Sequence, residues 1–194
     1  MRLVLFALLS LLPSVALAHP GHGDAGGLTA GFLHPLGGID HILAMVAVGL
    51  LAARLGGRAL WLVPSAFIAM MVAGGALGMA GVSIPCVETG VTMSVVVLGA
   101  AIAFELAPPV AVATALVGFF AIFHGHAHGA ETPETASGLA FGAGFVLATA
   151  LLHAVGFCAG LIVGLSGPGV ARPLRRIAGS GAALAGLAIL EGWI

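Results

Sequence analysis

Residues 34–49 read HPLGGIDHILAMVAVG, and this stretch organises the rest of the chain. It places the imidazoles of His34 and His41 and the carboxylate of Asp40 at the start of an apolar run that is suited to crossing a membrane. Ionisable side chains in such a segment are costly, so they mark candidate functional residues. The stretch therefore predicts a membrane helix with a site at one end.

Helical geometry predicts that these side chains gather on one side. If the helix begins near Leu36, His41 lies about two turns beyond His34, and Asp40 is rotated by about 100° from His41. Two nitrogens and an oxygen suit Ni, Co, Zn or Cu better than Mg or Ca, which prefer oxygen ligands. The alternative is that Asp40 caps the helix or balances a protonated His41.

Two motifs resemble those of the HupE/UreJ family of membrane permeases. The first is His34-Pro35-x-x-Gly38-x-Asp40-His41-x-x-Ala44-Met45-x-x-Val48-Gly49-x-x-Ala52. The second is Phe123-His124-Gly-His126-Ala-His128-Gly-x-Glu131. The resemblance spans nearly the whole chain, and it implies transport of nickel, and in some members cobalt, for hydrogenase and urease.

The composition is that of a membrane protein. The chain is 60% hydrophobic and only 7% charged, with a mean hydropathy of +1.20, whereas soluble domains carry roughly 25% charged residues. Its 194 residues fit one compact bundle. A net charge of −1 and the absence of lysine argue against a nucleic-acid partner. Cys86 and Cys158 form no zinc or redox motif.

The N-terminal 18 residues have the features of a cleavable signal peptide. Arg2 precedes a short apolar core, and Ala16-Leu-Ala18 resembles a cleavage site. Residues 19–35 then form a periplasmic tail rich in histidine and glycine. Its candidate metal-capturing residues are His19, His22 and Asp24. The alternative is a polar tail that merely follows the cleavage site.

Residues 36–194 are predicted to form an all-α transmembrane domain of about six helices, because about 20 apolar residues span a bilayer. The expected spans are 36–54, 59–80, 87–107, 109–128, 137–166 and 176–193. All arginines beyond Arg2 flank the first and fifth connections: Arg54, Arg58, Arg172, Arg175 and Arg176. The positive-inside rule places these connections in the cytoplasm and the mature N-terminus in the periplasm of a bacterial inner membrane.

The second motif predicts further ligands at the periplasmic mouth. His124 and His128 are spaced to share a helix face, and His126 points elsewhere. Glu131 continues that face if the helix runs through Gly129. The alternative is a solvated histidine-rich loop. The complete predicted metal set is His34, Asp40, His41, His124, His126, His128 and Glu131.

Three other ionisable residues are candidates for a pathway. Glu88 opens the third helix, where a carboxylate also suits the helix dipole. Glu105 lies at the inner end, as an exit point or as a capping carboxylate. His153 is expected to face the bundle interior, either along the pathway or in an interhelical hydrogen bond.

Small residues at intervals of four predict close helix packing. Gly74 and Gly78 form one such ridge, and Gly156, Gly160 and Gly164 form another. The same ridges are compatible with a homo-oligomer.

These features predict a secondary permease that moves a divalent metal as its substrate and has no cofactor. The resemblance to the HupE/UreJ family alone implies that this metal is Ni²⁺. The chain lacks a phosphate-binding loop, so the driving force must come from gradients. Histidine protonates near pH 6.5, so uptake should fall in acid. One alternative is a periplasm-facing metal sensor or accessory binding protein. Less favoured is a membrane metalloenzyme, or a serine protease at Ser166, which no later histidine could activate.

Overall fold

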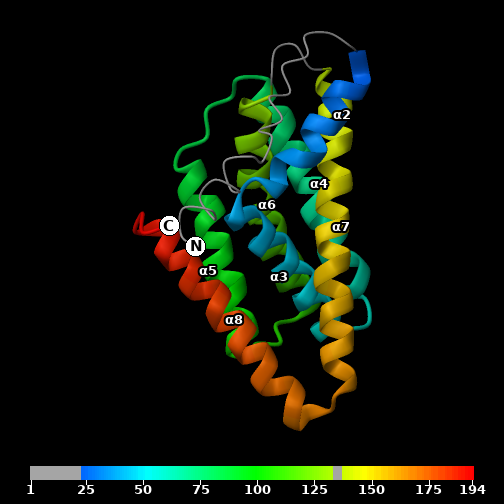
Figure 1. Cartoon of the computed structure of the whole chain (residues 1–194), viewed down its shortest axis with the longest axis vertical. Coiled ribbons are helices and arrows are strands. Elements are labelled where there is room, and N and C mark those ends of the chain that lie inside the picture. The colour runs from blue at the N-terminus through cyan, green and yellow to red at the C-terminus, as the bar shows by residue number, and fades with distance from the viewer. Residues whose placement is uncertain (1–22, 133–136) are drawn as a thin grey trace, which may run out of the picture.

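The computed structural model describes residues 23–132 and 137–194, and these form an all-helical bundle without strands (Figure 1). The elements in chain order are α2 (Gly23–Leu33), the 3-10 helix η1 (His34–Leu36), α3 (Ile39–Leu55), α4 (Ala59–Met79), α5 (Val87–Ala103), α6 (Val110–Ala130), α7 (Gly138–Leu165) and α8 (Pro168–Leu190). The predicted signal peptide, with its cleavage site, lies outside the described residues.

A helix lies at each of the six predicted spans, but not every helix has the character of a span. Three described helices, α4, α6 and α7, are long and apolar enough to cross a membrane. Residues 26–36 and 39–55 pass the same test only as a pair, which would make a fourth span bent by 82°. Helix α5 is apolar but has only 17 residues.

Helix α8 begins earlier than the sequence predicts. It starts at Pro168 rather than at residue 176 and includes the three arginines of this region. Proline is favoured at the first position of a helix, and arginine is a good helix former. The expected span, 176–193, left out Arg172 and Arg175. Charge is unfavourable in hydrocarbon, but this places no limit on where the helix itself begins.

Part of the predicted N-terminal tail is also helical. Helix α2 covers Gly23–Leu33 and packs along the first half of α7. A methyl group at Gly31 would overlap the carbonyl oxygen of Phe141, and one at Gly144 would overlap that of Leu28. Glycines that weaken an isolated helix here permit close backbone contact, so packing outweighs propensity.

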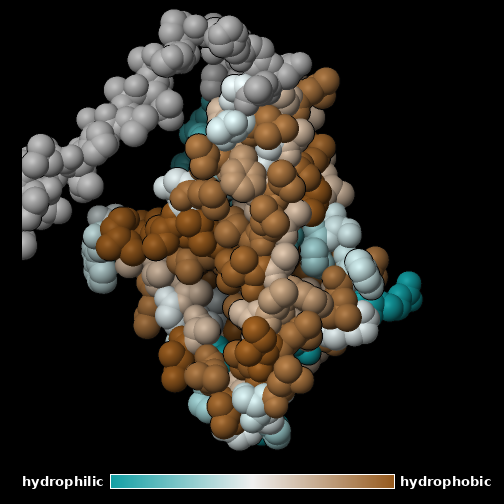
Figure 2. Space-filling view, turned by 45° about the vertical axis from the view of Figure 1, so that its right-hand side comes forward, coloured by the Kyte–Doolittle hydropathy of each residue, from teal (hydrophilic) through white to brown (hydrophobic). Residues whose placement is uncertain are grey.

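The outer surface is suited to lipid. Large apolar side chains on several helices are exposed, including Trp61 at 77%, Ile162 at 67% and Leu139 at 89%. Hydrophobic residues cover most of the face shown in Figure 2. Apolar side chains on the outside of a bundle with few charges are those expected of a membrane protein.

The glycine ridges are used within the chain. On α4, methyl groups at Gly74 and Gly78 would meet the carbonyl oxygens of Ile122 and His126 on α6. On α7, Gly156 packs against α3, whereas Gly164 has open space around it. The prediction that these ridges serve helix packing is therefore confirmed for the pairs α4–α6 and α3–α7.

Alanine at Gly125 is expected to destabilise the fold. A methyl group there would overlap the carbonyl oxygen of Met71, and backbone cannot move aside as a flexible side chain can. Overpacking of this kind costs about 1–3 kcal/mol. Thermal unfolding in detergent should show a lower Tm for Gly125→Ala than for Gly164→Ala, the matched helical control without a neighbour. Equal Tm values would contradict this packing.

The connected ends of α3 and α4 and of α5 and α6 enclose an apolar core. Its fully buried members include Val48, Leu51, Val63, Leu98 and Val117. The arginines that predict the cytoplasmic side lie at this same end of the chain's helices. The polar cluster described next lies toward the opposite end, where α6 finishes and α7 begins.

Candidate metal site

A corner between α2 and α3 carries the first motif. The helices meet at 82°, and His34 begins the 3-10 turn between them. Because α3 begins at Ile39, the prediction that His34 and His41 share one face of a continuous helix is wrong. Pro35 and the Gly37-Gly38 pair interrupt the helix here. The bend, rather than helical periodicity, brings the two histidines to one site.

Asp40 is folded back onto its neighbour His41. Its Oδ1 accepts a hydrogen bond from the His41 backbone N–H at 2.8 Å and lies 2.7 Å from His41 Nδ1. A methyl group at Gly38 would lie 2.7 Å from that oxygen and 2.9 Å from that nitrogen, so glycine makes room for the pair. A carboxylate at Nδ1–H leaves the lone pair of a neutral ring on Nε2. Asp40 therefore orients His41.

The histidines of α6 divide as the sequence predicts. His124 and His128 face the first motif, whereas His126 Nε2 donates to the Val82 carbonyl oxygen at 2.6 Å. His124 Nε2 lies 2.9 Å from Ser94 Oγ, whose own hydroxyl donates to a backbone carbonyl. Ser94 thus accepts from Nε2–H and leaves the lone pair of His124 on Nδ1.

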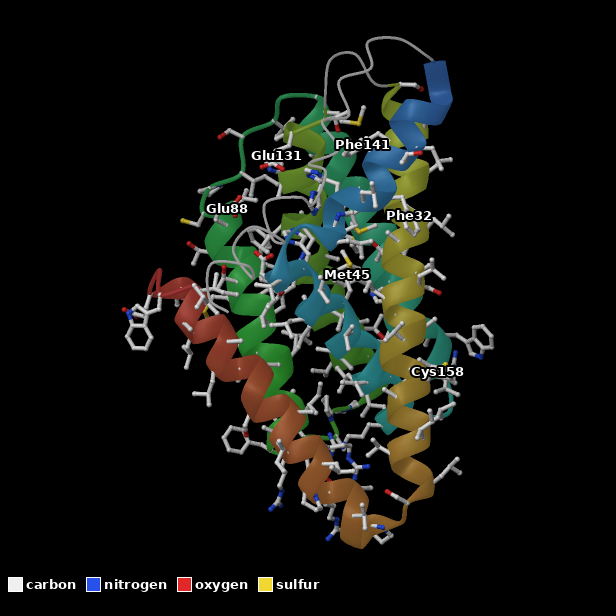
Figure 3. The ribbon with its side chains drawn as sticks, viewed as in Figure 1. Phe32, Met45, Glu88, Glu131, Phe141 and Cys158 are labelled. Atoms are coloured by element: carbon white, nitrogen blue, oxygen red, sulfur yellow. The ribbon has the colours of Figure 1, made fainter. Side chains whose placement is uncertain are left out.

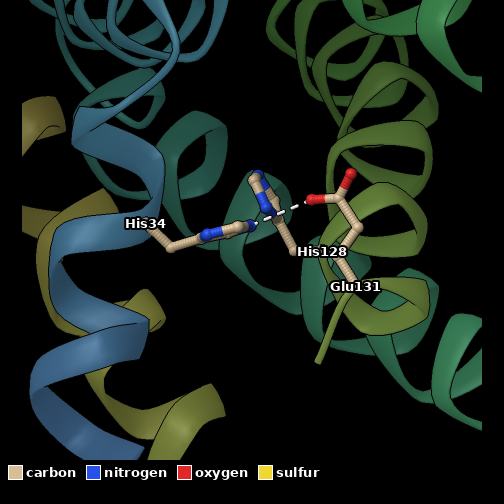
Figure 4. Close-up of side chains that lie close together, drawn as sticks. All are labelled: His34, His128 and Glu131. Atoms are coloured by element: carbon tan, nitrogen blue, oxygen red, sulfur yellow. Dashed lines mark hydrogen bonds and ion pairs between the residues drawn. The ribbon is translucent and has the colours of Figure 1, made fainter. Parts of the chain in front are cut away.

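Ring contacts join the two motifs into one cluster. Ring centroids are 4.7 Å apart for His34 and His128, 4.4 Å for His41 and His128, and 4.8 Å for His41 and His124. Glu131 Oε2 lies 3.1 Å from His34 Nε2 (Figure 4). Donor atoms of His34, His128 and Glu131 all lie within 4.8 Å of one another, a spacing that could hold a metal ion.

Solvent exposure falls steadily across the cluster. The side chains of Glu131 and His34 are 60% and 34% exposed, whereas His128 is 6% and His124 0% exposed. Several of the buried ring nitrogens have no hydrogen-bond partner within the described part of the chain: His41 Nε2, His124 Nδ1 and both nitrogens of His128. Unpartnered imidazoles are costly, so the cluster has the character of a ligand set.

Comparison with known proteins identifies the family. The HupE / UreJ protein family matches residues 7–189. A curated relative, Protein HupE of Rhizobium leguminosarum bv. viciae, is 49% identical over 183 residues, which cover 93% of each chain. The chain belongs to the HupE/UreJ family. No solved structure matches it.

HupE/UreJ proteins form a metal transport and accessory family associated with nickel and cobalt for hydrogenase and urease, and not an enzyme family. A metal is accordingly substrate here rather than cofactor. Family membership and the apolar helices together make this HupE/UreJ chain a multi-pass membrane protein.

Other predicted residues of this HupE/UreJ protein lie outside the cluster. His126 is turned toward Val82, and Glu88 is exposed at the start of α5, at the same end as Glu131 (Figure 3). His153 is buried in α7, with its ring against that of Phe67. Of the proposed capture residues, His19 and His22 lie outside the described residues, and Asp24 lies in α2.

Sequence reasoning missed Ser94 and Phe67. Ser94 is fully buried and holds His124, and Phe67 is fully buried with its ring 5.5 Å from that of His124. Ser94 could have been noticed in the sequence, because it is a hydroxyl residue in the middle of an apolar helix. Nothing in the sequence distinguishes Phe67 from other apolar side chains.

Glu105 lies at the opposite end of the HupE/UreJ bundle from the histidine cluster, just after α5. Arg175 Nε donates to its Oε1 at 2.8 Å, and Arg54 donates to the backbone carbonyls of Glu105 and Leu106. The hydrogen bonds from Arg175 hold the pKa of Glu105 below its ordinary value of 4.5, although burial opposes this shift. These contacts favour the structural alternative for Glu105, a carboxylate that ties α5 to α8.

A pH-dependent contribution to stability follows from this ion pair. A lowered folded pKa stabilises the fold above pH 4.5, and the contribution is lost as pH falls toward the folded pKa. Glu105→Gln should therefore lower stability at pH 7 by on the order of 1 kcal/mol. The difference in Tm from the unmodified protein should shrink on acidification. Glu191→Gln, at an exposed carboxylate, is the control, and a pH-independent difference would contradict this explanation.

Proposed function

We propose that this protein is a secondary permease that takes up a divalent transition-metal cation, most favourably Ni²⁺, from the periplasm across the bacterial inner membrane. In this proposal it supplies metalloenzymes such as hydrogenase or urease. The observation that carries the proposal is the convergence of His34, His41, His124 and His128, from two motifs far apart in sequence, into one cluster of graded exposure.

The ligand chemistry supports a borderline divalent ion. Imidazole nitrogens suit Ni, Co, Cu and Zn, and the carboxylates of Glu131 and Asp40 add negative charge at the mouth. Neither exposed cysteine, Cys86 or Cys158, takes part, so no thiolate would bind the ion too firmly for release. Cobalt fits the same donors, and nickel is favoured over it by the family alone.

The membrane potential is sufficient to drive uptake. Moving a dication inward across ~100 mV is favourable by about 4.6 kcal/mol, which corresponds to more than about a thousandfold accumulation. No nucleotide hydrolysis is then needed. Arginines at the end opposite to the cluster support an orientation with the donor groups and the mature N-terminus outside.

Among the described residues, the part of the buried core at the arginine end of the bundle is aliphatic. Val48, Leu51, Leu98 and Val117 are 0–1% exposed and fill the end of the bundle opposite to Glu131. We interpret this conformation as one in which the ion enters from the periplasm and the inner side is closed. Transport then requires the helices to rearrange around the bound ion.

Nickel uptake by cells that lack their own nickel transporters tests the proposal. Expression of the chain should raise accumulation of radioactive nickel, and excess cobalt should compete more strongly than magnesium. Expression without accumulation, with the protein correctly inserted in the membrane, would argue against a permease.

The closed core also suits a second candidate, an accessory protein or sensor that binds metal without moving it. Purified protein in liposomes separates the two, because a permease admits nickel to the lumen under an inside-negative potential and a binding protein does not. Nickel bound at the outer surface but absent from the lumen would favour the binding protein.

A further inference from the structure

His153 is a buried histidine outside the cluster of His34, His41, His124 and His128, which with Asp40 and Glu131 forms the mouth. It lies in α7 and is 4% exposed, and neither ring nitrogen has a hydrogen-bond partner among residues 23–132 and 137–194. An imidazole buried without a partner is disfavoured unless something compensates. The interhelical hydrogen bond predicted as its structural role is absent from these described contacts.

The ring of His153 is held in a defined place. Its backbone carbonyl lies against Gly49 of α3, where a methyl group would overlap it. The ring packs edge-on against Phe67 of α4, with centroids 5.0 Å apart and planes at 88°. One turn earlier on α7, Thr149 donates to Met71 Sδ at 3.5 Å. This part of α7 therefore faces the bundle interior.

His124 connects this position to the mouth. Its ring lies 4.8 Å from that of His41 and 5.5 Å from Phe67, so His124 and His153 contact the same aromatic ring. Exposure is 8% at His41, 0% at His124 and 4% at His153. Buried imidazoles thus continue from His41 through His124 to His153, with the ring of Phe67 in contact with the last two.

We infer that His124 and His153 form a second, inner metal station, through which the ion passes after the mouth and where ions are selected. This inference rests on the proposed permease function. In the described part of the chain, neither ring is hydrogen-bonded or ion-paired to a carboxylate. Imidazole donors alone suit Ni²⁺, Co²⁺, Cu²⁺ and Zn²⁺, whereas Mg²⁺, Ca²⁺ and Mn²⁺ favour oxygen ligands.

The two stations then have different tasks. The mouth combines imidazole with the carboxylates of Asp40 and Glu131 and captures the hydrated ion. The inner station has no paired carboxylate to offset the charge of a dication, so it holds the ion weakly. His153, which belongs to the inner station alone, therefore contributes to flux and selectivity, and hardly to binding at equilibrium.

The test compares nickel binding with nickel flux in the full-length protein, purified and reconstituted in liposomes, with Ni²⁺ alone as the probe. His153→Leu, which keeps an apolar side chain of similar size, should bind nickel within about twofold of the unmodified protein. Its initial flux should fall by about tenfold or more. His153→Gln provides a second variant if the first does not fold, and Thr149→Val is the matched control, buried one turn away.

A selectivity measurement adds an independent readout. His153→Asp introduces a carboxylate, so the ratio of Ni²⁺ flux to Mn²⁺ flux should fall by about tenfold. Unchanged nickel flux in folded His153→Leu and His153→Gln would overturn the inner station and leave the permease intact. Parallel loss of binding and flux would also overturn it, by placing His153 at the mouth. Absence of flux in the unmodified protein would refute the permease, and the inner station with it.

Discussion

Nickel uptake is expected to fall by about 100-fold or more when His128 is replaced by alanine. His128 is the central ring of the cluster, with centroids 4.7 Å from His34 and 4.4 Å from His41. It is also part of the group of donors whose atoms lie within 4.8 Å of one another, with Glu131. Its loss removes a ligand and two of the ring contacts between the two motifs. Initial rates of radioactive nickel uptake, normalised to protein in the membrane, measure the effect.

His126→Ala is the matched control for His128→Ala. Both residues lie on α6 and both are buried, but His126 Nε2 is directed at the Val82 carbonyl oxygen, away from the cluster. Uptake by His126→Ala should stay within about threefold of the unmodified protein, since no ligand is lost. A comparable loss of uptake in both variants would mean that uptake depends on how many histidines α6 carries and not on where they point. Full activity of His128→Ala would show that the ion binds elsewhere.

Much of the fold was predictable because membrane helices consist of long apolar stretches of sequence. The helices from α3 to α7 begin within a few residues of the predicted starts, since glycine, proline and charge interrupt the runs there. The number of spans is a different question: among the described helices, only α4, α6 and α7 are each long and apolar enough to cross a membrane without a partner helix. Helix α2 was not predicted because its glycines indicate a flexible tail when the segment is considered alone. In the structure these glycines allow α2 to pack closely against α7.

The site was predictable in its residue types and less so in its geometry. Helical spacing correctly separated His126 from His124 and His128, because all three lie on one regular helix. The same reasoning was wrong for His34, which lies beyond a corner of 82°. Helical spacing also predicted Asp40 at the edge of a face shared with both histidines. In the structure its carboxylate forms a hydrogen bond with the ring of His41, the next residue. Local periodicity predicts contacts within a helix and cannot anticipate how two helices meet.

Graded burial gives the cluster a direction. An ion at Glu131 and His34 keeps access to water, whereas one at His124 is surrounded by protein. Each step inward exchanges a hydration ligand for an imidazole, and the exchange is favourable only for ions that accept nitrogen readily. Abundant Mg²⁺ is therefore expected to stop at the carboxylates. The order of the residues along the path, and not their affinity alone, would then set selectivity.

Asp40→Asn is expected to reduce nickel affinity by about 10–100-fold without changing the fold. Asparagine has the same shape as aspartate. Its Oδ1 can still accept the hydrogen bond from the His41 backbone N–H, which is 2.8 Å long in the unmodified protein. The negative charge beside His41 Nδ1 is lost, and with it the preference for a ring with its lone pair on Nε2. Equilibrium binding and uptake at limiting nickel should fall together, while Tm stays close to that of the unmodified protein.

A double-mutant cycle shows whether Asp40 acts through His41. If the carboxylate only orients this ring, Asp40→Asn should have little further effect once His41 is alanine, so that His41→Ala and the double variant transport nickel equally slowly. Additive losses would instead mean that Asp40 Oδ1, now 2.7 Å from His41 Nδ1, turns to bind the ion directly during transport. Unchanged affinity in Asp40→Asn would exclude both roles, and the short contact would then serve only to begin α3.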